Sequence, residues 1–342
     1  HRDLHSFPTR RSSDLTDFWN DEQELKEQLL HVSSTIENTV ATAHGFIRPI
    51  LLDHVQSVGK MLRPALVLIT SALGEHSITE DAVRVGSVIE LIHLASLVHD
   101  DIIDSASKRR GKSTVYAKVG AKQAVLAGDF LLAKALLLTS GKERGMDSRV
   151  VSAALSRLCE SELDQDAGQG DFLISRHTYL RRIAGKTASL FALSCYSGVA
   201  LQEAPPVKQM LCHRIGYCMG MAFQIQDDVL DYAGSSSKLG KQTGNDLKCG
   251  IPTLPLIYAL DQEQRNGGAE LRDLLLSSTI PLKEKTVKQA LVLVESLGGV
   301  QKAEILAESY KMRALSDIKR LAHPQVERQL GNLFAKLSKR SV

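Results

Sequence analysis

The sequence predicts an all-α protein with one large domain over residues 16–342, on three observations. From about residue 16 onward, apolar residues recur with the 3.6-residue period of amphipathic helices. No segment shows the strict alternation of apolar and polar residues that marks a half-buried strand. The connections between the periodic runs are short and hold no Pro- or Ser-rich linker, so nothing marks a boundary between domains.

The first half of the chain predicts three helices. Apolar residues at helical spacing over 25–40 give the first amphipathic helix. Residues 59–73 give a second, with Pro64 near its start, where a helix tolerates proline. A third, long helix is expected to begin at Ile78, with Thr79 as its N-cap.

The second half continues in the same way. Further helices are expected over residues 121–138, 150–165, 178–201 and 207–232, with another short helix starting between Pro252 and Pro255. Residues 271–337 alternate charged and apolar positions, as helices that cover a surface do. The segments that end near Asp104 and Asp231 each exceed about 20 residues, or roughly 30 Å of helix.

Net charge, cysteine content and the length of the apolar runs limit the classes of protein to which this chain can belong. The 342 residues carry 42 basic and 39 acidic side chains, so the net charge of +3 does not indicate a nucleic-acid-binding protein. The five cysteines are an odd number without any CxxC pair, which favours buried thiols in a reducing compartment. The longest apolar runs fall short of a membrane span. We therefore expect a cytoplasmic protein.

The first fifteen residues, HRDLHSFPTRRSSDL, do not share the pattern of the rest. They show no helical period, and their acidic residues argue against a transit peptide. They also resemble a translated sequencing adapter. We expect residues 1–15 to be disordered or non-native, and we exclude them from the fold.

Three carboxylates end the long third helix. Asp100 and Asp104 stand at positions i and i+4, so they share one helix face roughly 5–6 Å apart. Like charges at that spacing destabilise a helix unless something neutralises them, and Mg²⁺ carrying substrate phosphates would do so. A solvated acidic helix end is the alternative reading of this motif alone.

A second copy of the same spacing closes the helix over 207–232. Asp227, Asp228 and Asp231 repeat the DDxxD pattern after another long run that is poor in charge. Carboxylates on facing helices of a bundle are a common way to build a metal site. Two such motifs are harder to explain by solvation than one.

Positive side chains accompany both acidic motifs. They are Lys60, Arg63, Arg109, Arg110, Lys186 and Lys241. Forked arginine donors and mobile lysine ammonium groups are suited to diphosphate recognition, although any single pair could be a surface salt bridge. Together with the two acidic motifs, they favour a substrate with two phosphorylated ends, one held by metal and one by Arg and Lys.

In order along the chain, GKxxRP (59–64), DDxxD (100–104) followed by RRG (109–111), GKT (185–187) and FQxxDDxxD (223–231) form one pattern. The chain resembles the trans-polyprenyl diphosphate synthases, from about residue 16 to the C-terminus. Within this family it resembles the long-chain type, such as heptaprenyl, octaprenyl or nonaprenyl diphosphate synthase. The resemblance implies the isoprenoid synthase fold, a helical bundle around a central cavity.

The resemblance also implies a role for each motif residue. The Mg²⁺ ligands would be Asp100, Asp104, Asp227 and Asp231, supported by Asp101 and Asp228, with three ions expected around the bound diphosphate. The allylic diphosphate would contact Arg109, Lys186, Thr187, Gln224 and Lys241. Isopentenyl diphosphate would contact Lys60, Arg63, His93 and Arg110. His93 lies two helical turns before Asp100, which suits this role, although a lone helical histidine is more often structural.

The reaction implied is a Mg²⁺-dependent 1′-4 condensation of isopentenyl diphosphate with an allylic diphosphate. Ala95 and Ser96 lie about one turn before Asp100, where short-chain relatives place an aromatic ring. With Ile92 as the next layer, these small residues predict a long product of roughly six to ten isoprene units, suited to a quinone side chain. Transient membrane contact is expected for product release.

Several alternatives stay open. The product could be of medium, geranylgeranyl-type length, or the chain could be the catalytic half of a heteromer with a small partner; a homodimer is the simpler expectation. His99-Asp100 could belong to an HD-type phosphohydrolase, but this class leaves the second DDxxD motif unexplained. A terpene cyclase would carry a different second motif. Finally, Gly216 and Gly220 give a small-xxx-small face that predicts close helix packing.

Overall fold

A computed structural model describes residues 15, 17–56, 59–75, 79–109, 111–139, 147–233 and 243–338. These residues are overwhelmingly helical, as the sequence predicts. They divide into two compact units, which are described separately: the first holds residues up to 148 together with 194–209, and the second holds 149–193 and 210 onward. The expectation of one domain over 16–342 stays a prediction. Residues 1–14 lie outside the described part, and Leu15 is buried.

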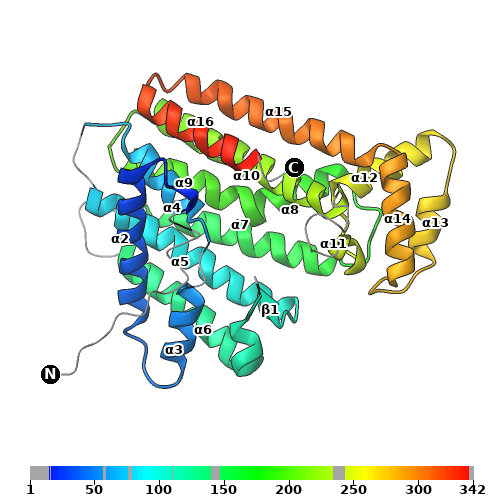
Figure 1. Ribbon diagram of the computed structural model, residues 1–342, viewed down its shortest axis with the longest axis horizontal. Coiled ribbons are helices and arrows are strands. Elements are labelled where there is room, and N and C mark those ends of the chain that lie inside the picture. Colours follow the sequence, from blue (N-terminus) through cyan, green and yellow to red (C-terminus); the bar gives the residue numbers. More distant parts are fainter. Residues whose placement is uncertain are drawn as a thin grey trace. The chain divides into compact units, whose positions relative to one another are not determined.

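The first unit is organised around one long helix. Its elements are α2 (Gln23–Val40), α3 (Ile47–Gln56), α4 (Leu62–Ser71), α5 (Thr79–Ile103), β1 (Lys108–Arg109), β2 (Lys112–Ser113) and α6 (Val115–Thr139). Helix α5 packs against α2, α4 and α6, and it is buried along most of its length (Figure 1). The core helix is therefore the one that ends in the first aspartate motif.

Helix boundaries in this unit follow local chemistry. Pro64 occupies the first turn of α4, where its missing N–H costs no helical hydrogen bond. Gly120 has φ 77° and ψ 170°, so the regular part of α6 begins at the residue after it, as the sequence predicts. Thr79 is the first helical residue of α5, and Ile78 lies outside the described residues. The antiparallel pair β1–β2 is too short to produce a strand pattern in the sequence.

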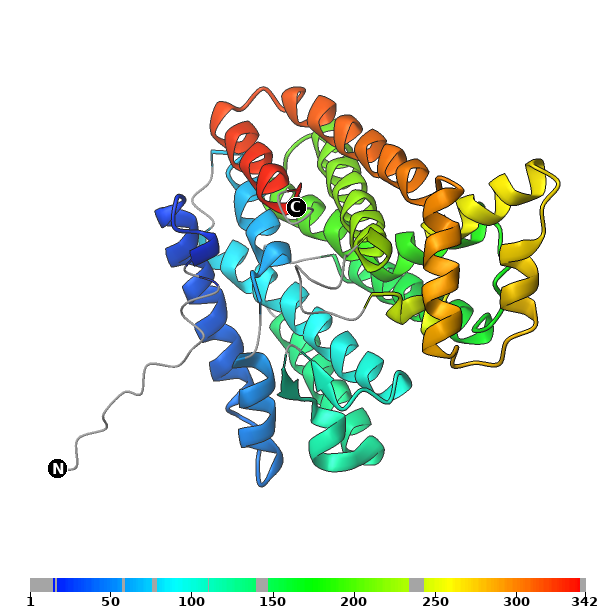
Figure 2. The ribbon, with the colours of Figure 1, turned by 45° about the vertical axis from the view of Figure 1, so that its right-hand side comes forward.

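The remaining helices belong wholly or partly to the second unit. They are α7 (Ser148–Ala167), α8 (Arg176–Ile183), the π-helix η1 (Ala184–Ala188), α9 (Ser189–Ala200), α10 (Pro206–Ala233), α11 (Asn245–Lys248), α12 (Leu254–Arg265), α13 (Glu270–Leu276), α14 (Glu284–Ser296), α15 (Gly299–Lys319) and α16 (Pro324–Ser338). Helices α9 and α10 each cross the division between the units. Figure 2 shows α12, α13 and α14 gathered at one end of this unit, where α15 packs against α12.

The small-xxx-small face of α10 lies in the second unit and packs as predicted. A Cβ on Gly216 would collide with the carbonyl oxygen of Phe191, and one on Gly220 would lie 2.6 Å from the Cα of Ala188. The two glycines therefore let α10 approach the η1–α9 segment closely. This backbone contact fixes the helix that carries the second aspartate motif.

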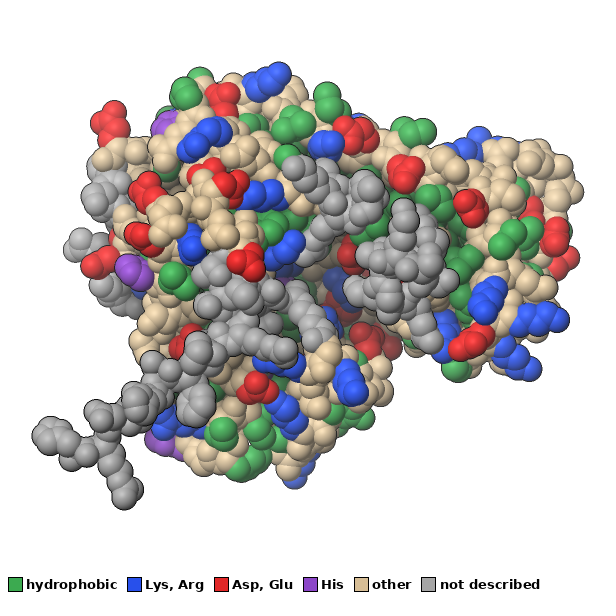
Figure 3. Space-filling view, viewed as in Figure 1, with side chains coloured by type: hydrophobic (Ala, Val, Ile, Leu, Met, Phe, Trp, Pro, Cys, Tyr) green, Lys and Arg blue, Asp and Glu red, His purple; other side chains and the backbone are tan. Residues whose placement is uncertain are grey.

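Among the described residues, α5 is the one helix long and apolar enough to cross a membrane by length and composition. Its most apolar window is 72% buried, and the core helix of a protein passes the same test. Basic and acidic side chains are interspersed on the face shown in Figure 3, in keeping with the small net charge.

Candidate active site

The first aspartate motif occupies the last turn of α5 and the residue after it. Asp104 follows the last helical residue, and its N–H still donates to the carbonyl of Asp100 at 2.8 Å. Asp101 is 1% exposed, whereas Asp100 is half-buried and Asp104 is exposed. The helix thus turns Asp100 and Asp104 outward and Asp101 inward, because residues i and i+4 share a face.

Arg109 lies directly beside this motif. Its Nε donates to the Oδ1 of Asp101 at 2.9 Å, and it is held in place by the β1–β2 pair. The guanidinium is partly exposed while the Asp101 carboxylate is buried, so one side of the arginine fork is used and the rest can meet solvent or ligand. Arg110 lies outside the described residues.

Three of the residues predicted to bind isopentenyl diphosphate lie within the described part of the first unit. Lys60 precedes α4, Arg63 is in its first turn, and His93 is half-buried on α5. Burial lowers the pKa of Arg63 to about 10, and the charge of the buried Glu90 on α5 opposes that shift. Arg63 therefore stays positively charged at neutral pH. The sequence reading missed Glu90, a lone acid in an apolar run.

The three residues expected to set product length also lie on α5. Ala95 and Ile92 are fully buried, and Ser96 is half-buried. The Ser96 hydroxyl donates to the carbonyl of His93 at 2.8 Å, so it lies against the backbone of its own helix. Their role in chain length stays a prediction.

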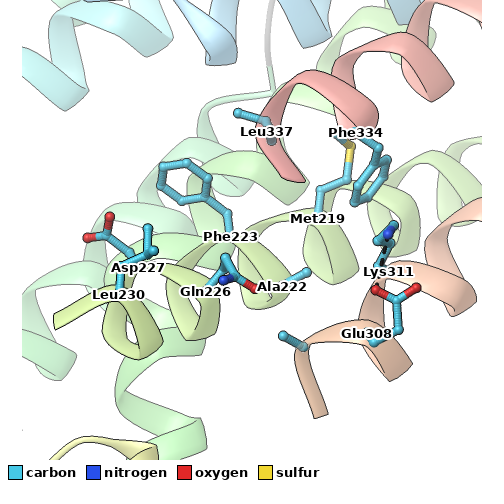
Figure 4. A pocket seen from close by; sticks show the side chains of 11 residues that line it. Met219, Ala222, Phe223, Gln226, Asp227, Leu230, Glu308, Lys311, Phe334 and Leu337 are labelled. Atoms are coloured by element: carbon cyan, nitrogen blue, oxygen red, sulfur yellow. Dashed lines mark hydrogen bonds and ion pairs between the residues drawn. The ribbon is translucent and has the colours of Figure 1, made fainter. Parts of the chain in front are cut away.

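The second aspartate motif lies on α10, and its Asp227 lines a pocket of about 170 Å³ formed by residues of α10, α15 and α16. Figure 4 shows Asp227 beside Leu230 at one end of this pocket and Lys311 with Glu308 at the other. The Lys311 and Glu308 side chains form an ion pair of 3.1 Å. Asp227 is exposed, which is the state expected of a carboxylate that takes a ligand from outside.

Asp228 points the other way, into the core of the second unit. It is 4% exposed and accepts hydrogen bonds from the Tyr179 hydroxyl at 2.6 Å and from Gln224 Nε2 at 2.8 Å. Burial raises its pKa to about 8, although both hydrogen bonds lower it. Asp228 is thus a buried carboxyl held by two donors, and its role in catalysis stays a prediction. Tyr179 was missed from sequence, where nothing distinguishes it from other helical tyrosines.

Lys186 and Thr187 lie in the π-helix η1. Gly185 makes this wider turn fit, since a Cβ there would lie 2.6 Å from the carbonyl oxygen of Arg157. Thr187 donates to Gln224 Oε1 at 2.6 Å, which connects η1 to the Gln224–Asp228 pair on α10. Lys186 forms an ion pair of 3.0 Å with Glu162 on α7, a partner that the sequence reading did not identify.

Asp231 has a different set of partners from the other motif carboxylates. Its two oxygens accept from the backbone N–H groups of Asn245 and Asp246, at 3.2 and 3.1 Å. These contacts join the end of α10 to the start of α11, after residues 234–242, which are not described. Lys241, predicted to bind the allylic diphosphate, lies in that range.

The donor set of the two motifs is compatible with Mg²⁺. Among the described residues, no group of three or more His, Cys, Asp or Glu side chains gathers closely enough to hold a metal ion alone. Mg²⁺ is usually held by one or two carboxylates together with waters and substrate phosphates, so a complete protein cage is not required. The outward carboxylates of each motif fit that pattern.

Comparison with known proteins agrees with this arrangement. Residues 46–294 match the sequence model of the polyprenyl synthetase family. The "heptaprenyl diphosphate synthase component 2" of Geobacillus stearothermophilus is 38% identical over 70% of this chain and 75% of its own. The crystal structure of heptaprenyl diphosphate synthase from Staphylococcus aureus superposes with a TM-score of 0.84 at 29% identity, over 93% of this chain and 99% of its own. A geranylgeranyl pyrophosphate synthase from Lactobacillus brevis gives 0.82 at 31%, over 93% and 98%.

The fold and these similarities define an all-α prenyltransferase. The chain belongs to the polyprenyl synthetase family, and the isoprenoid synthase fold expected from its motifs is confirmed. Use of a divalent metal ion follows from membership of this family.

Proposed function

We propose that this protein condenses isopentenyl diphosphate with an allylic diphosphate to make a long-chain all-trans polyprenyl diphosphate. In each cycle the allylic C–O bond breaks, a C–C bond forms at the double bond of isopentenyl diphosphate, and one proton leaves. We assign that proton to the departing diphosphate, as the resemblance to the family implies. A quinone side chain is a suitable use for such a product.

Three bound Mg²⁺ ions would neutralise the leaving diphosphate and stabilise the charge that develops on it. Asp100, Asp104, Asp227 and Asp231 are the proposed ligands. Asp101 and Asp228 support them from the buried side, since each is held by hydrogen bonds within its own unit. The residues assigned to the allylic diphosphate are Arg109, Lys186, Thr187, Gln224 and Lys241, and those assigned to isopentenyl diphosphate are Lys60, Arg63, His93 and Arg110.

Two of the assigned residues already have a partner within the protein. Lys186 is paired with Glu162, and Arg109 is paired with Asp101. An arriving diphosphate carries more negative charge than a carboxylate, so it can draw Lys186 away from Glu162 or share it. Arg109 can keep its Nε contact and offer its terminal nitrogens. The apolar helix faces serve to keep water from the carbocation.

The observation that carries the long-chain assignment is the pair Ala95 and Ser96 one turn before Asp100 on α5. Neither side chain can fill the space that an aromatic ring would, so a growing product can extend along the helix. The names of similar proteins support this, because heptaprenyl diphosphate synthases are among them.

One other product and one other assembly are alternatives with the same chemistry. The Lactobacillus brevis protein is named a geranylgeranyl pyrophosphate synthase, which favours a medium-length product. The name "component 2" of the Geobacillus relative favours a heteromer in which a small partner is needed. A homodimer, a cytoplasmic location and transient membrane contact complete the proposal.

One incubation separates these outcomes. Purified protein is mixed with labelled isopentenyl diphosphate, Mg²⁺ and geranyl, farnesyl or geranylgeranyl diphosphate, and the products are resolved by chain length. Products of roughly six to ten isoprene units support the proposal, and twenty-carbon products favour the medium-chain alternative. Elongation only after a candidate small subunit is added favours the heteromer. Absence of elongation with and without that subunit contradicts the proposal.

The metal assignment is tested by Asp100→Asn and Asp227→Asn, with the exposed Asp261→Asn on α12 as the control. Each motif variant is expected to lose about a hundredfold or more in elongation rate, the scale of removing one charge-stabilising group. Each should also lose the rise in melting temperature that Mg²⁺ with inorganic diphosphate gives the unaltered protein. Retention of that rise would contradict the ligand role.

A further inference from the structure

Lys60 is held at both its backbone and its side chain by two aromatic residues. The indole N–H of Trp19 donates to the carbonyl oxygen of Lys60 at 2.8 Å. The Lys60 ammonium lies 4.2 Å from the centre of the Phe18 ring, in cation–π contact. The two rings meet edge to face, with centres 4.9 Å apart, and Trp19 is only 2% exposed. The aromatic pair is therefore a fixed support for the lysine.

The residue after Lys60 has an unusual backbone conformation. Met61, the N-cap of α4, has φ 49° and ψ 46°, in the left-handed region that residues with a Cβ rarely adopt. Such outliers persist where the surrounding structure fixes them, and they gather at functional sites. The Trp19 hydrogen bond fixes the carbonyl on one side of Met61. The Met61 carbonyl accepts from Ala65 N at 3.0 Å on the other side, inside α4.

This arrangement suits a lysine that receives an anion. A lysine stem is flexible, and ordering it on binding costs conformational entropy. The face of Phe18 attracts the ammonium group through the charge distribution of the ring. The ammonium is then pre-ordered, and Arg63, three residues later in the first turn of α4, stays charged as well. Pre-ordering the donor lowers the cost of binding.

We propose that Phe18 and Trp19 are positioning residues that hold the Lys60 ammonium for the diphosphate of isopentenyl diphosphate. This inference rests on the proposed function, in which Lys60 binds that substrate. Both aromatic residues precede residues 46–294, the part of the chain that matches the family, so the match assigns them no role.

The test uses the full chain and the fact that Trp19 is its single tryptophan. Isopentenyl diphosphate is titrated into the protein while tryptophan fluorescence is followed, and a saturable change is expected. Phe18→Leu keeps an apolar side chain but loses the ring face. It is expected to raise the Kd from this titration, and the KM for isopentenyl diphosphate, by about two- to fivefold, the scale of one exposed cation–π contact. The kcat and the KM for the allylic substrate are expected to stay unchanged.

Phe18→Tyr restores a ring face and is expected to restore the original Kd. The matched control is Tyr310→Leu, which removes the ring under Arg313 on α15, a cation–π pair with no proposed role in binding. An unchanged Kd in Phe18→Leu would overturn the proposal, as would an equal rise in both KM values or a rise in Tyr310→Leu as well. If the protein binds isopentenyl diphosphate but never elongates it, the proposed function is contradicted. The Kd values from fluorescence still decide whether Phe18 helps Lys60 to bind isopentenyl diphosphate.

Discussion

The hydroxyl of Tyr179 on α8 donates a 2.6 Å hydrogen bond to the buried carboxyl of Asp228 on α10. Gln224, one turn earlier on α10, donates to the other oxygen at 2.8 Å, and Thr187 donates to Gln224 in turn. These contacts form one connected chain from η1 to the second aspartate motif. Burial also raises the pKa of Tyr179 well above its ordinary value, so its hydroxyl keeps its proton.

Tyr179→Phe is expected to lower the free energy of unfolding by about 1–3 kcal/mol, because it removes one of the two donors to a buried carboxyl. Urea unfolding at neutral pH measures the loss. The control is Tyr116→Phe, at a half-buried tyrosine in the first turn of α6, which is expected to change stability little. Equal urea midpoints for Tyr179→Phe and the unaltered protein would show that the hydrogen bond does not matter.

Ser96→Phe is expected to shorten the product by at least one isoprene unit, because a ring one turn before Asp100 would occupy the path of the growing chain. Ser96 is half-buried, so it can accept a larger side chain more readily than the fully buried Ala95. Chain-length analysis of the labelled products is the measurement. Ser96→Ala keeps the site small and should leave the length unchanged. If neither Ser96→Phe nor Ala95→Phe shortens the product, the growing chain does not pass beside these two residues.

Gly216→Ala is expected to destabilise the protein by about 1–3 kcal/mol, the usual cost of overpacking. The added Cβ would meet the backbone carbonyl of Phe191, which cannot move aside as a side chain can. Gly331→Ala on α16 is the matched control, because a Cβ there meets no atom within 4 Å. It is expected to be neutral or to stabilise by up to about 1 kcal/mol, as alanine is the better helix former. A similar loss in both variants would contradict close packing at Gly216.

Asp317 on α15 gives a pH-dependent contribution to stability. Its hydrogen bond from Arg214 Nε, 2.6 Å long, is the largest cause of a pKa below the ordinary value for aspartate, and Arg320 adds to the effect. A carboxyl with a lowered folded pKa contributes stability that is present above the unfolded pKa, near about 3.9, and lost as pH falls through the folded value.

Asp317→Asn should therefore unfold at lower urea concentration than the unaltered protein at pH 7, and the difference should shrink as pH falls below about 4. Because Arg214 is largely exposed, the loss at pH 7 is expected to be about 1 kcal/mol or less. A difference that stays constant from pH 7 to strongly acidic pH would show that the carboxylate charge is not responsible.

Helical periodicity was enough to predict most of the fold. The predicted runs over 25–40, 121–138, 150–165 and 207–232 correspond to α2, the regular part of α6, α7 and α10. Helix α3 was missed because its ten residues include a proline and a histidine, and only Leu51 and Val55 are buried. The π turn η1 was missed as well, since the apolar pattern continues through it from α8 into α9.

The site was predicted less completely than the fold. Motif spacing identified Lys60, Lys186 and Asp228, but the partners of these residues come from distant parts of the chain. They are Phe18, Glu162 and Tyr179 respectively, and no local pattern marks them. Their roles depend on tertiary contacts such as the 3.0 Å ion pair between Lys186 and Glu162, which only folding brings together.

The π turn at η1 also sets the rotation of α9 about the helix axis relative to α8, within the long segment over 176–200. An α-helix advances about 100° per residue, so one extra residue in a turn rotates everything after it relative to everything before it. Helix α8 can then direct Tyr179 and Ile183 into the core while α9 buries a separate set of side chains. A single-residue deletion in η1 would restore uniform pitch and misalign one of these two faces. The π turn that contains Lys186 and Thr187 therefore determines which faces of α8 and α9 are buried.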